Sequence, residues 1–275
     1  MSVPIRWFAR GAAYGGGGAG LLGAVGAGLL WSEAKLARHT VRPPETGAPL
    51  PAAEYGLPGA KPGPPLRVAV LGDSSAAGMG CAFPDETPGA LLATSLAESG
   101  RLVELDVLAV VGSRSADLEP QVARALLNPP HVAVISIGAN DVTHLVPSRQ
   151  AVAELSSAVA RLRTAGVGVV VGTCPDLSTV RPLAQPLRWL AGRRSKEMAA
   201  AQTVAVVAAG GVPVALAELL GPRFRAEPAL FCSDRFHPSP AGYRLLADAL
   251  LPAVAAAAGL DARLPGLDSS DAHTG

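Results

Sequence analysis

The chain is poor in the residues that mark disulfide-rich, metal-binding or aromatic-lined proteins. Aromatic residues make up 4% of its 275 residues, and its three cysteines (Cys81, Cys174 and Cys232) include no Cys-x-x-Cys pair. An odd number of cysteines at irregular spacing argues against a disulfide framework and against a zinc site. We therefore expect three small buried side chains. A domain outside the cytoplasm could still form one bridge, for which Cys174 and Cys232 are the candidates.

Charge of one sign and the motifs of nucleotide binding are also missing. The formal net charge is +1 and no run of five basic residues occurs, so composition gives no case for a nucleic-acid partner. The glycine-rich loop that begins at Gly72 lacks the Gly-Lys-Ser/Thr of a phosphate-binding loop. Apolar residues, by contrast, make up 49% of the chain, which is enough for the core of one sizeable α/β domain.

The amino-terminal part of the sequence contains a long uncharged stretch. Residues 11–31 carry no charge and follow Arg6 and Arg10, and a helix needs about 20 apolar residues to cross a bilayer. Four glycines at 15–18 lower both helix propensity and hydrophobicity. We favour an uncleaved signal-anchor over a cleaved signal peptide and over a flexible cytoplasmic tail. We accordingly expect a membrane-anchored or secreted protein of the cell envelope rather than a cytoplasmic one.

Composition divides the rest of the chain into a linker, one domain and a tail. Residues 42–65 contain eight prolines, which remove backbone donors and favour an extended linker. The part of this linker near Tyr55 and Leu57 can lie against the domain. We expect an apolar segment at 1–40, the linker at 41–65, a catalytic domain at 66–260 and a short disordered tail at 261–275.

Within the domain, apolar runs alternate with stretches of helical periodicity. Five runs read as strands, at residues 68–71, 102–111, 131–137, 167–173 and 212–217. Strands that are apolar throughout indicate a parallel sheet covered by helices on both faces. Ser74, Gly112 and Asn140 each follow the end of a different predicted strand. Because ligands bind at the carboxyl ends of such strands, we expect these residues on one rim of the sheet.

Two short stretches supply the groups of an activated hydroxyl nucleophile. Gly72-Asp73-Ser74 follows the first strand, and Asp234-x-x-His237 precedes the last helix. A serine hydroxyl is a weak nucleophile until an imidazole takes its proton, and a third group must orient that imidazole. Ser74 does not lie in the Gly-x-Ser-x-Gly turn of α/β-hydrolases, because Ala76 takes the last position.

These stretches, together with Gly112 and Gly138-x-Asn140-Asp141, resemble the four sequence blocks of the SGNH (GDSL-type) hydrolases, in the right order. The resemblance covers roughly residues 67–260. It implies a flavodoxin-like three-layer α/β/α sandwich, consistent with a parallel sheet of about five strands. It also implies a serine esterase that uses no metal and no organic cofactor.

The resemblance assigns a role to each block residue. Ser74 would be the nucleophile, His237 the base and Asp234 its orienting partner. The oxyanion hole would comprise the backbone amides of Ser74 and Gly112 and the side-chain amide of Asn140. The assignment of Gly112 rests on position alone, because valines at 110 and 111 replace the asparagine that often precedes this glycine in the family. Asp73 and Asp141 are expected to hold their loops through backbone hydrogen bonds, and His144 is an alternative substrate contact.

We predict a hydrolase of carboxylic (O-acyl) esters that acts through an acyl-serine intermediate on a small-molecule or glycan ester. The alternative is a non-catalytic or acyltransferase relative that binds an acylated cell-envelope glycan. Short acyl chains are favoured, because so few aromatic residues leave no evident long apolar groove. Residues 176–196 read either as a solvated basic helix face or as a wall facing the substrate or a membrane, and include Arg188, Trp189, Arg193, Arg194 and Lys196.

Overall fold

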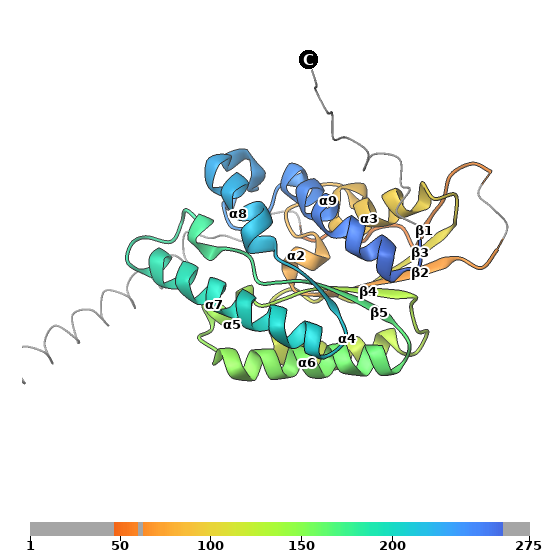
Figure 1. Cartoon of the computed structure of the whole chain (residues 1–275). Helices are drawn as coiled ribbons and strands as arrows, with labels where there is room; N and C mark the ends of the chain where they lie inside the picture. Colours follow the sequence, from red (N-terminus) through yellow and green to blue (C-terminus); the bar gives the residue numbers. More distant parts are fainter. Residues whose placement is uncertain (1–46, 60–62, 261–275) are drawn as a thin grey trace, which may run out of the picture.

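A computed structural model describes residues 47–59 and 63–260 (Figure 1). The predicted apolar segment at 1–40 and the predicted tail at 261–275 lie outside these residues, and the domain boundaries stay predictions. Among the helices of residues 47–59 and 63–260, none combines the length and the apolar character that a bilayer crossing requires.

A six-stranded sheet with the order β1-β3-β2-β4-β5-β6 forms the middle layer. Its strands are β1 (Glu54–Tyr55), β2 (Leu66–Gly72), β3 (Val103–Val107), β4 (Val132–Ser136), β5 (Gly168–Gly172) and β6 (Val212–Val214). Strands β2 to β6 are parallel, as the five apolar runs predicted. The sixth strand, β1, pairs antiparallel with β3 and comes from the predicted proline-rich linker.

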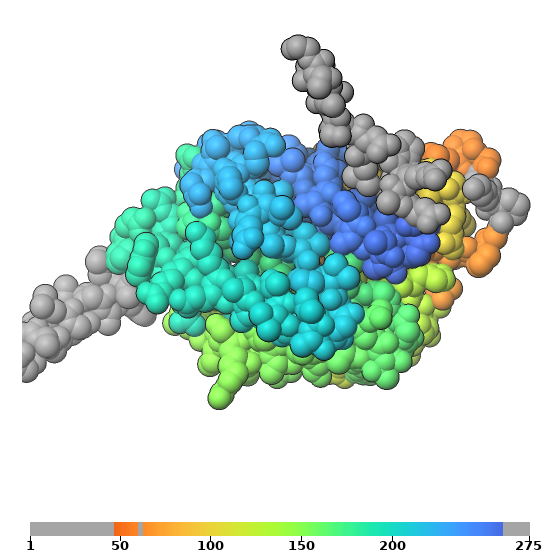
Figure 2. Space-filling model, in the orientation of Figure 1, coloured from red at the N-terminus to blue at the C-terminus, as the bar shows by residue number. Residues whose placement is uncertain are grey.

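Helices cover both faces of the sheet, and the fold is the expected three-layer α/β/α sandwich (Figure 1). The α-helices are α2 (Ser74–Ala77), α3 (Pro88–Ala97), α4 (Leu118–Ala125), α5 (Ala139–Thr143), α6 (Ser148–Thr164), α7 (Leu187–Ala208), α8 (Leu216–Ala226) and α9 (Pro240–Ala257). Four 3₁₀ turns lie between them, η1 (Pro84–Glu86), η2 (Ser115–Asp117), η3 (Leu177–Thr179) and η4 (Pro228–Leu230). In the space-filling view of Figure 2, the side chains of α6 and α7 on one side of the sheet and of α8 and α9 on the other form a continuous surface.

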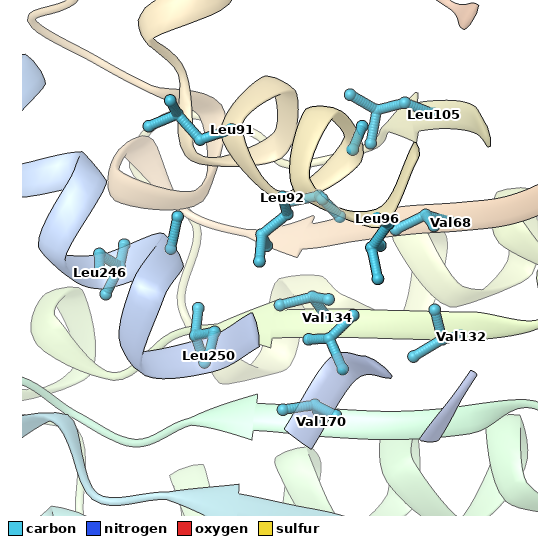
Figure 3. Close-up of a cluster of buried hydrophobic side chains, with 14 of the residues drawn as sticks. Val68, Leu91, Leu92, Leu96, Leu105, Val132, Val134, Val170, Leu246 and Leu250 are labelled. Atoms are coloured by element: carbon cyan, nitrogen blue, oxygen red, sulfur yellow. The ribbon is translucent and has the colours of Figure 1, made fainter. Parts of the chain in front are cut away.

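The core is split by the sheet into two apolar layers. Because successive strand residues point to opposite faces, Val68 and Val70 of β2 pack under α3 and α9, whereas Ala69 and Leu71 pack against α4 and α6. Figure 3 shows the first layer, in which Leu92 and Leu96 of α3 point toward the strands. Burying a Val or Leu side chain contributes about 1.5–3 kcal/mol, so these two layers hold the strand ends, and the loops after them, in place.

Candidate active site

The residues predicted to follow three different strands lie on one rim of the sheet, beyond the carboxyl ends of the parallel strands. Ser74 begins α2 directly after β2, and Asn140 lies in α5 after β4. His237 lies in the loop between η4 and α9. The parallel pairing of β2 with β4 brings the first two loops together (Figure 1), and the packing of α9 on the sheet supplies the third.

Ser74, His237 and Asp234 form a continuous chain of hydrogen bonds. The Oγ of Ser74 lies 2.9 Å from Nε2 of His237, although 163 residues separate them in sequence. The other ring nitrogen, Nδ1, lies 2.6 Å from Oδ2 of Asp234. All three residues are buried. This is the geometry in which a carboxylate orients an imidazole, and the imidazole can accept a hydroxyl proton.

The loop that carries Asp234 holds its carboxylate through several short-range donors. Oδ1 accepts hydrogen bonds from the backbone N–H of Phe236 at 2.8 Å and of His237 at 2.9 Å, and from the thiol of Cys232 at 3.0 Å. Burial by itself would raise the pKa of Asp234, but the hydrogen bonds from His237, Cys232 and the backbone lower it to about 2. Asp234 is therefore ionised at neutral pH and fixed in position.

The turn that carries Ser74 is held by two side chains. Asp73 caps α2, because its Oδ1 accepts a hydrogen bond from the N–H of Ser75 at 2.9 Å, which confirms its expected structural role. Gln121 of α4 accepts from the N–H of Gly72 at 2.8 Å and donates to the carbonyl of Gly72 at 3.0 Å. Burial raises the pKa of Asp73 to about 6, against the opposing hydrogen bond from Ser75.

The loops after β3 and β4 are tied to each other. The amide of Asn140 donates to the carbonyl of Ser113 at 3.0 Å, which uses one of its two N–H donors. Asp141 accepts from the backbone N–H of Ser115 at 3.0 Å and from its hydroxyl at 2.9 Å, so its expected loop-holding role is confirmed. Gly112 lies in the turn that the Ser113 N–H closes on Val110, with φ of 85°, a conformation that favours glycine.

Several residues of the site were not predicted from the sequence. Gln121 occupies the buried face of α4 beside Leu118 and Val122, and a polar residue inside such a stripe is the signal that could have marked it. Tyr243 of α9 is fully buried, and its hydroxyl donates to the carbonyl of Met79 at 2.7 Å. It thereby joins the last helix to the loop that follows Ser74.

A mostly apolar cavity of about 90 Å³ lies beside Ser75. It is lined by aromatic and aliphatic side chains that include Phe224, Phe231, Phe236, Leu177, Val180 and Leu220. Three of the five phenylalanines of the chain therefore gather in one place. The low aromatic content predicted that there would be no long apolar groove, but three of the few aromatic side chains lie together around this cavity.

The remaining candidates lie outside this arrangement. His144 is exposed at the end of α5, and its ring hydrogen-bonds to the carbonyl of Asn140 at 2.8 Å. The bridge considered between Cys174 and Cys232 is wrong, because both thiols and that of Cys81 are free. Cys174 is fully buried behind Gly138, whereas Cys232 packs against Gly80 and donates to Asp234. Within the described residues, no three acidic, histidine or cysteine side chains gather as metal ligands.

Comparison with known proteins finds similarity to one family. The profile of the GDSL-like Lipase/Acylhydrolase family matches residues 70–245. The chain is 48% identical over 193 residues to the GDSL-like esterase Rv1075c of Mycobacterium tuberculosis (strain ATCC 25618 / H37Rv), covering 69% of this chain and 62% of the relative. The chain thus spans less than two thirds of that relative's length.

Solved structures share the fold at lower sequence identity. One is a putative lipolytic protein of the G-D-S-L family from Desulfitobacterium hafniense DCB-2, with a TM-score of 0.56 and 15% identity, matched over 68% of this chain and 99% of the other. Another is Axe2, an acetylxylan esterase from Geobacillus stearothermophilus, with a TM-score of 0.53 and 20% identity over 68% of this chain and 93% of the other.

Proposed function

Because this chain belongs to the GDSL-like lipase/acylhydrolase family, we propose that it hydrolyses carboxylic esters with Ser74 as the nucleophile. One observation carries the proposal, the hydrogen-bond chain from Ser74 Oγ through His237 to Asp234. The GDSL-like esterase of M. tuberculosis, at 48% identity, is named for the same activity. Because all three members of this hydrogen-bond chain are present, it also favours hydrolysis over the alternative of a non-catalytic binding protein.

The arrangement supports two successive acyl transfers. Ser74 Oγ attacks the ester carbonyl carbon while His237 Nε2 takes the hydroxyl proton, and the carbonyl π electrons move to its oxygen. Collapse of this tetrahedral adduct breaks the bond to the alcohol oxygen, which leaves with the proton from His237. Water then attacks the carbonyl carbon of the acyl-serine ester and gives a proton to His237. Collapse of this second adduct breaks the bond to Ser74 Oγ, which takes that proton from His237, and the acid is released. Asp234 stabilises the imidazolium in both halves.

Three donors are proposed to stabilise the oxyanion. The N–H of Ser74 belongs to the first turn of α2, where backbone donors have no acceptor within the helix. The N–H of Gly112 is not the donor that closes its own turn, because Ser113 supplies that hydrogen bond. The second amide hydrogen of Asn140 remains once the first is given to Ser113. Such donors act where negative charge develops.

The apolar cavity beside Ser75 is proposed as the acyl site. Its volume is about 90 Å³, whereas a cavity of about 150 Å³ takes up a guest the size of benzene. The cavity therefore fits an acyl chain of only a few carbons. The preference for short acyl chains is therefore proposed from the volume of this cavity. The low aromatic content of the sequence suggests the same preference.

The test is hydrolysis of p-nitrophenyl acetate, butyrate and octanoate by the full chain and by Ser74→Ala. We expect the variant to lose at least about 10³-fold in kcat, because removal of the nucleophile leaves only binding and oxyanion stabilisation. Ser75→Ala is the matched control, since it removes the adjacent hydroxyl, and should lose less than about tenfold. Equal activity in Ser74→Ala and the unaltered protein would show that another residue is the nucleophile.

Membrane association through residues 11–31 and a cell-envelope location are part of this proposal on sequence grounds alone. Extraction of a membrane fraction with alkaline carbonate tests them. A signal-anchor keeps the full chain in the pellet, whereas release into the supernatant would contradict an integral anchor.

A further inference from the structure

A second cavity lies beside the apolar one and is lined mainly by charged and polar side chains. Its volume is about 820 Å³, within the range of about 300–1,000 Å³ that is typical of ligand pockets. It is formed by η3, the loop that follows η3, the first turns of α7 and Arg225 near the end of α8. The two cavities share Thr179 as a lining residue, so they adjoin each other.

Five basic side chains line this cavity, which we call the basic pocket: Arg181, Arg188, Arg193, Lys196 and Arg225. Two carboxylates pair with them. Glu197 lies 2.9 Å from Arg193, and Asp176 lies 2.8 Å from Arg225 and 3.5 Å from Lys196. Five positive charges less two negative charges leave an excess of three, in a chain whose whole net charge is +1.

Two of the arginines, Arg181 and Arg188, form no ion pair with any carboxylate in the part of the chain that the structure describes. Arg181 donates only to the backbone carbonyl of Arg225, at 3.3 Å. Both guanidinium groups are therefore available to an external anion. A planar guanidinium matches the paired oxygens of a phosphate and stays charged at any physiological pH.

Local packing gives the basic pocket a floor and an aromatic wall. A Cβ on Gly192 would lie 2.5 Å from Cβ of Ser178, so the absence of a side chain lets α7 approach η3 closely. Trp189 is 60% exposed on the same helix face, and the guanidinium of Arg193 lies 5.9 Å from its ring centroid. An exposed ring beside several cations can hold the uncharged body of a ligand while the cations hold its anion.

We propose that the basic pocket binds a phosphate group on the ligand of this protein. The excess of three positive charges suits an anion with several oxygens and more than one charge. Under the proposed esterase function, on which this step rests, the phosphate would belong to the alcohol part of the ester, with the acyl chain in the apolar cavity. Its source is either a soluble phosphorylated ester or the headgroup of a phospholipid.

The first experiment measures binding of inorganic pyrophosphate to the full chain by titration calorimetry. Replacing both unpaired arginines, in Arg181→Ala/Arg188→Ala, should weaken binding at least tenfold. The charge-matched control is Arg124→Ala/Arg244→Ala, which removes two exposed arginines of α4 and α9, and should change affinity less than twofold. Thermal melts of both variants check the fold. Absence of pyrophosphate binding, or equal weakening in the two variants, would overturn the proposal.

Vesicles distinguish the two sources of phosphate. Greater retention on phosphatidylglycerol than on phosphatidylcholine vesicles, by an excess that Arg181→Ala/Arg188→Ala abolishes, would assign a lipid headgroup. Equal retention of Arg181→Ala/Arg188→Ala and the unaltered protein on phosphatidylglycerol vesicles and on phosphatidylcholine vesicles, with pyrophosphate binding by the unaltered protein intact, would assign a soluble phosphorylated ester. None of these measurements needs turnover, so they test the basic pocket independently of the Ser74→Ala result.

Discussion

The negative charges of two buried carboxylates on the same rim, Asp234 and Asp176, are stabilised in different ways. Asp234 receives its hydrogen bonds from groups within three residues of it, including two backbone N–H groups and the ring of His237. Asp176 accepts one backbone hydrogen bond, from the N–H of Ser178 at 2.9 Å, and pairs with Arg225 and Lys196, whose side chains are 56% and 60% exposed. Short-range backbone donors fix an orientation, whereas long solvated side chains supply charge that can be rearranged. The comparison separates a part of the rim built for fixed geometry from a part built for adjustable binding.

The fixed part of the rim should tolerate little change. Asn140→Ala removes a proposed oxyanion donor, and loss of one such donor typically lowers kcat by about 10²–10³. Kinetics on p-nitrophenyl acetate measure this effect. Asn128→Ala, an exposed position before β4, is the matched control and should leave kcat unchanged. A change in kcat of less than threefold in Asn140→Ala would remove Asn140 from the proposed oxyanion hole.

Asp73 is a third buried carboxylate beside the proposed nucleophile. The side chain of Asp73 accepts a hydrogen bond from Ser75, whereas the side chain of Asp234 accepts from four donors. Burial raises the pKa of Asp73 to about 6, whereas the hydrogen bonds lower the pKa of Asp234 to about 2. A folded-state pKa above the unfolded value means that the folded state holds the proton more tightly. The stabilisation from this proton is complete below about pH 4 and is lost as pH rises through about 6.

Asp73→Asn should remove that loss, because an amide stays neutral and can still accept from Ser75. The free energy of unfolding of the variant minus that of the wild type should rise by about 2–3 kcal/mol between pH 4 and pH 7. Urea denaturation at the two pH values measures it. Asp248→Asn, at an exposed position of α9, should show a change below about 0.5 kcal/mol. A flat difference for Asp73→Asn would mean that Asp73 is ionised in the fold at both pH values.

The acyl site can be narrowed without touching the hydrogen-bonded residues. Leu220 lines the apolar cavity, and the adjacent Leu219 is 56% exposed on the same helix. Leu220→Trp should lower the ratio of kcat/KM for butyrate over acetate by about tenfold, since methylene groups in a pocket are worth about 1–3 kcal/mol in discrimination. Leu219→Trp should leave the ratio unchanged. An unchanged ratio in Leu220→Trp would place the acyl chain elsewhere on the rim.

Added salt should weaken ligand binding in the basic pocket more than it slows ester hydrolysis, and this effect should be smaller than those of the substitutions above. Raising ionic strength from about 0.05 M to 0.5 M shortens the screening length well below about 10 Å. Pyrophosphate binding by the exposed cations of the basic pocket should weaken several-fold. Hydrolysis of a neutral p-nitrophenyl ester, which depends on the buried Ser74, His237 and Asp234, should change less than twofold. Parallel losses in both measurements would show that the exposed cations and the buried residues do not differ in their sensitivity to salt.

The sequence predicted those parts of the molecule that depend on local pattern. The five parallel strands follow from apolar runs, and the placement of Ser74 and Asn140 on one rim follows from the parallel pairing of their strands. Strand β3 is shorter than predicted. It ends at Val107, although the N–H groups of Leu108 and Val110 still donate to β2, and Val110 and Val111 are exposed in a turn. Strand β1 has two residues, too few to show an alternating pattern among prolines.

The two cavities depend on contacts that no local pattern contains. The basic pocket joins Arg225 of α8 to Arg188 of α7 across η3, and the apolar cavity gathers side chains from both ends of the domain. Spacing on α7 did indicate a basic face, but the excess of charge is visible only once Asp176 and Glu197 are placed. The hydrogen bonds of Gln121 to Gly72 likewise require the fold, since 49 residues separate them.

The long interval between Ser74 and His237 also bears on how the protein is made. A ribosome adds the serine 163 residues before its base, and the hydroxyl of Tyr243, later still, closes the loop at Met79. Until α9 has emerged and packed on the sheet, the nascent chain holds a serine with no imidazole to activate it. The proposed ester cleavage therefore requires the finished domain, and a message truncated before codon 234 should yield a product that lacks it.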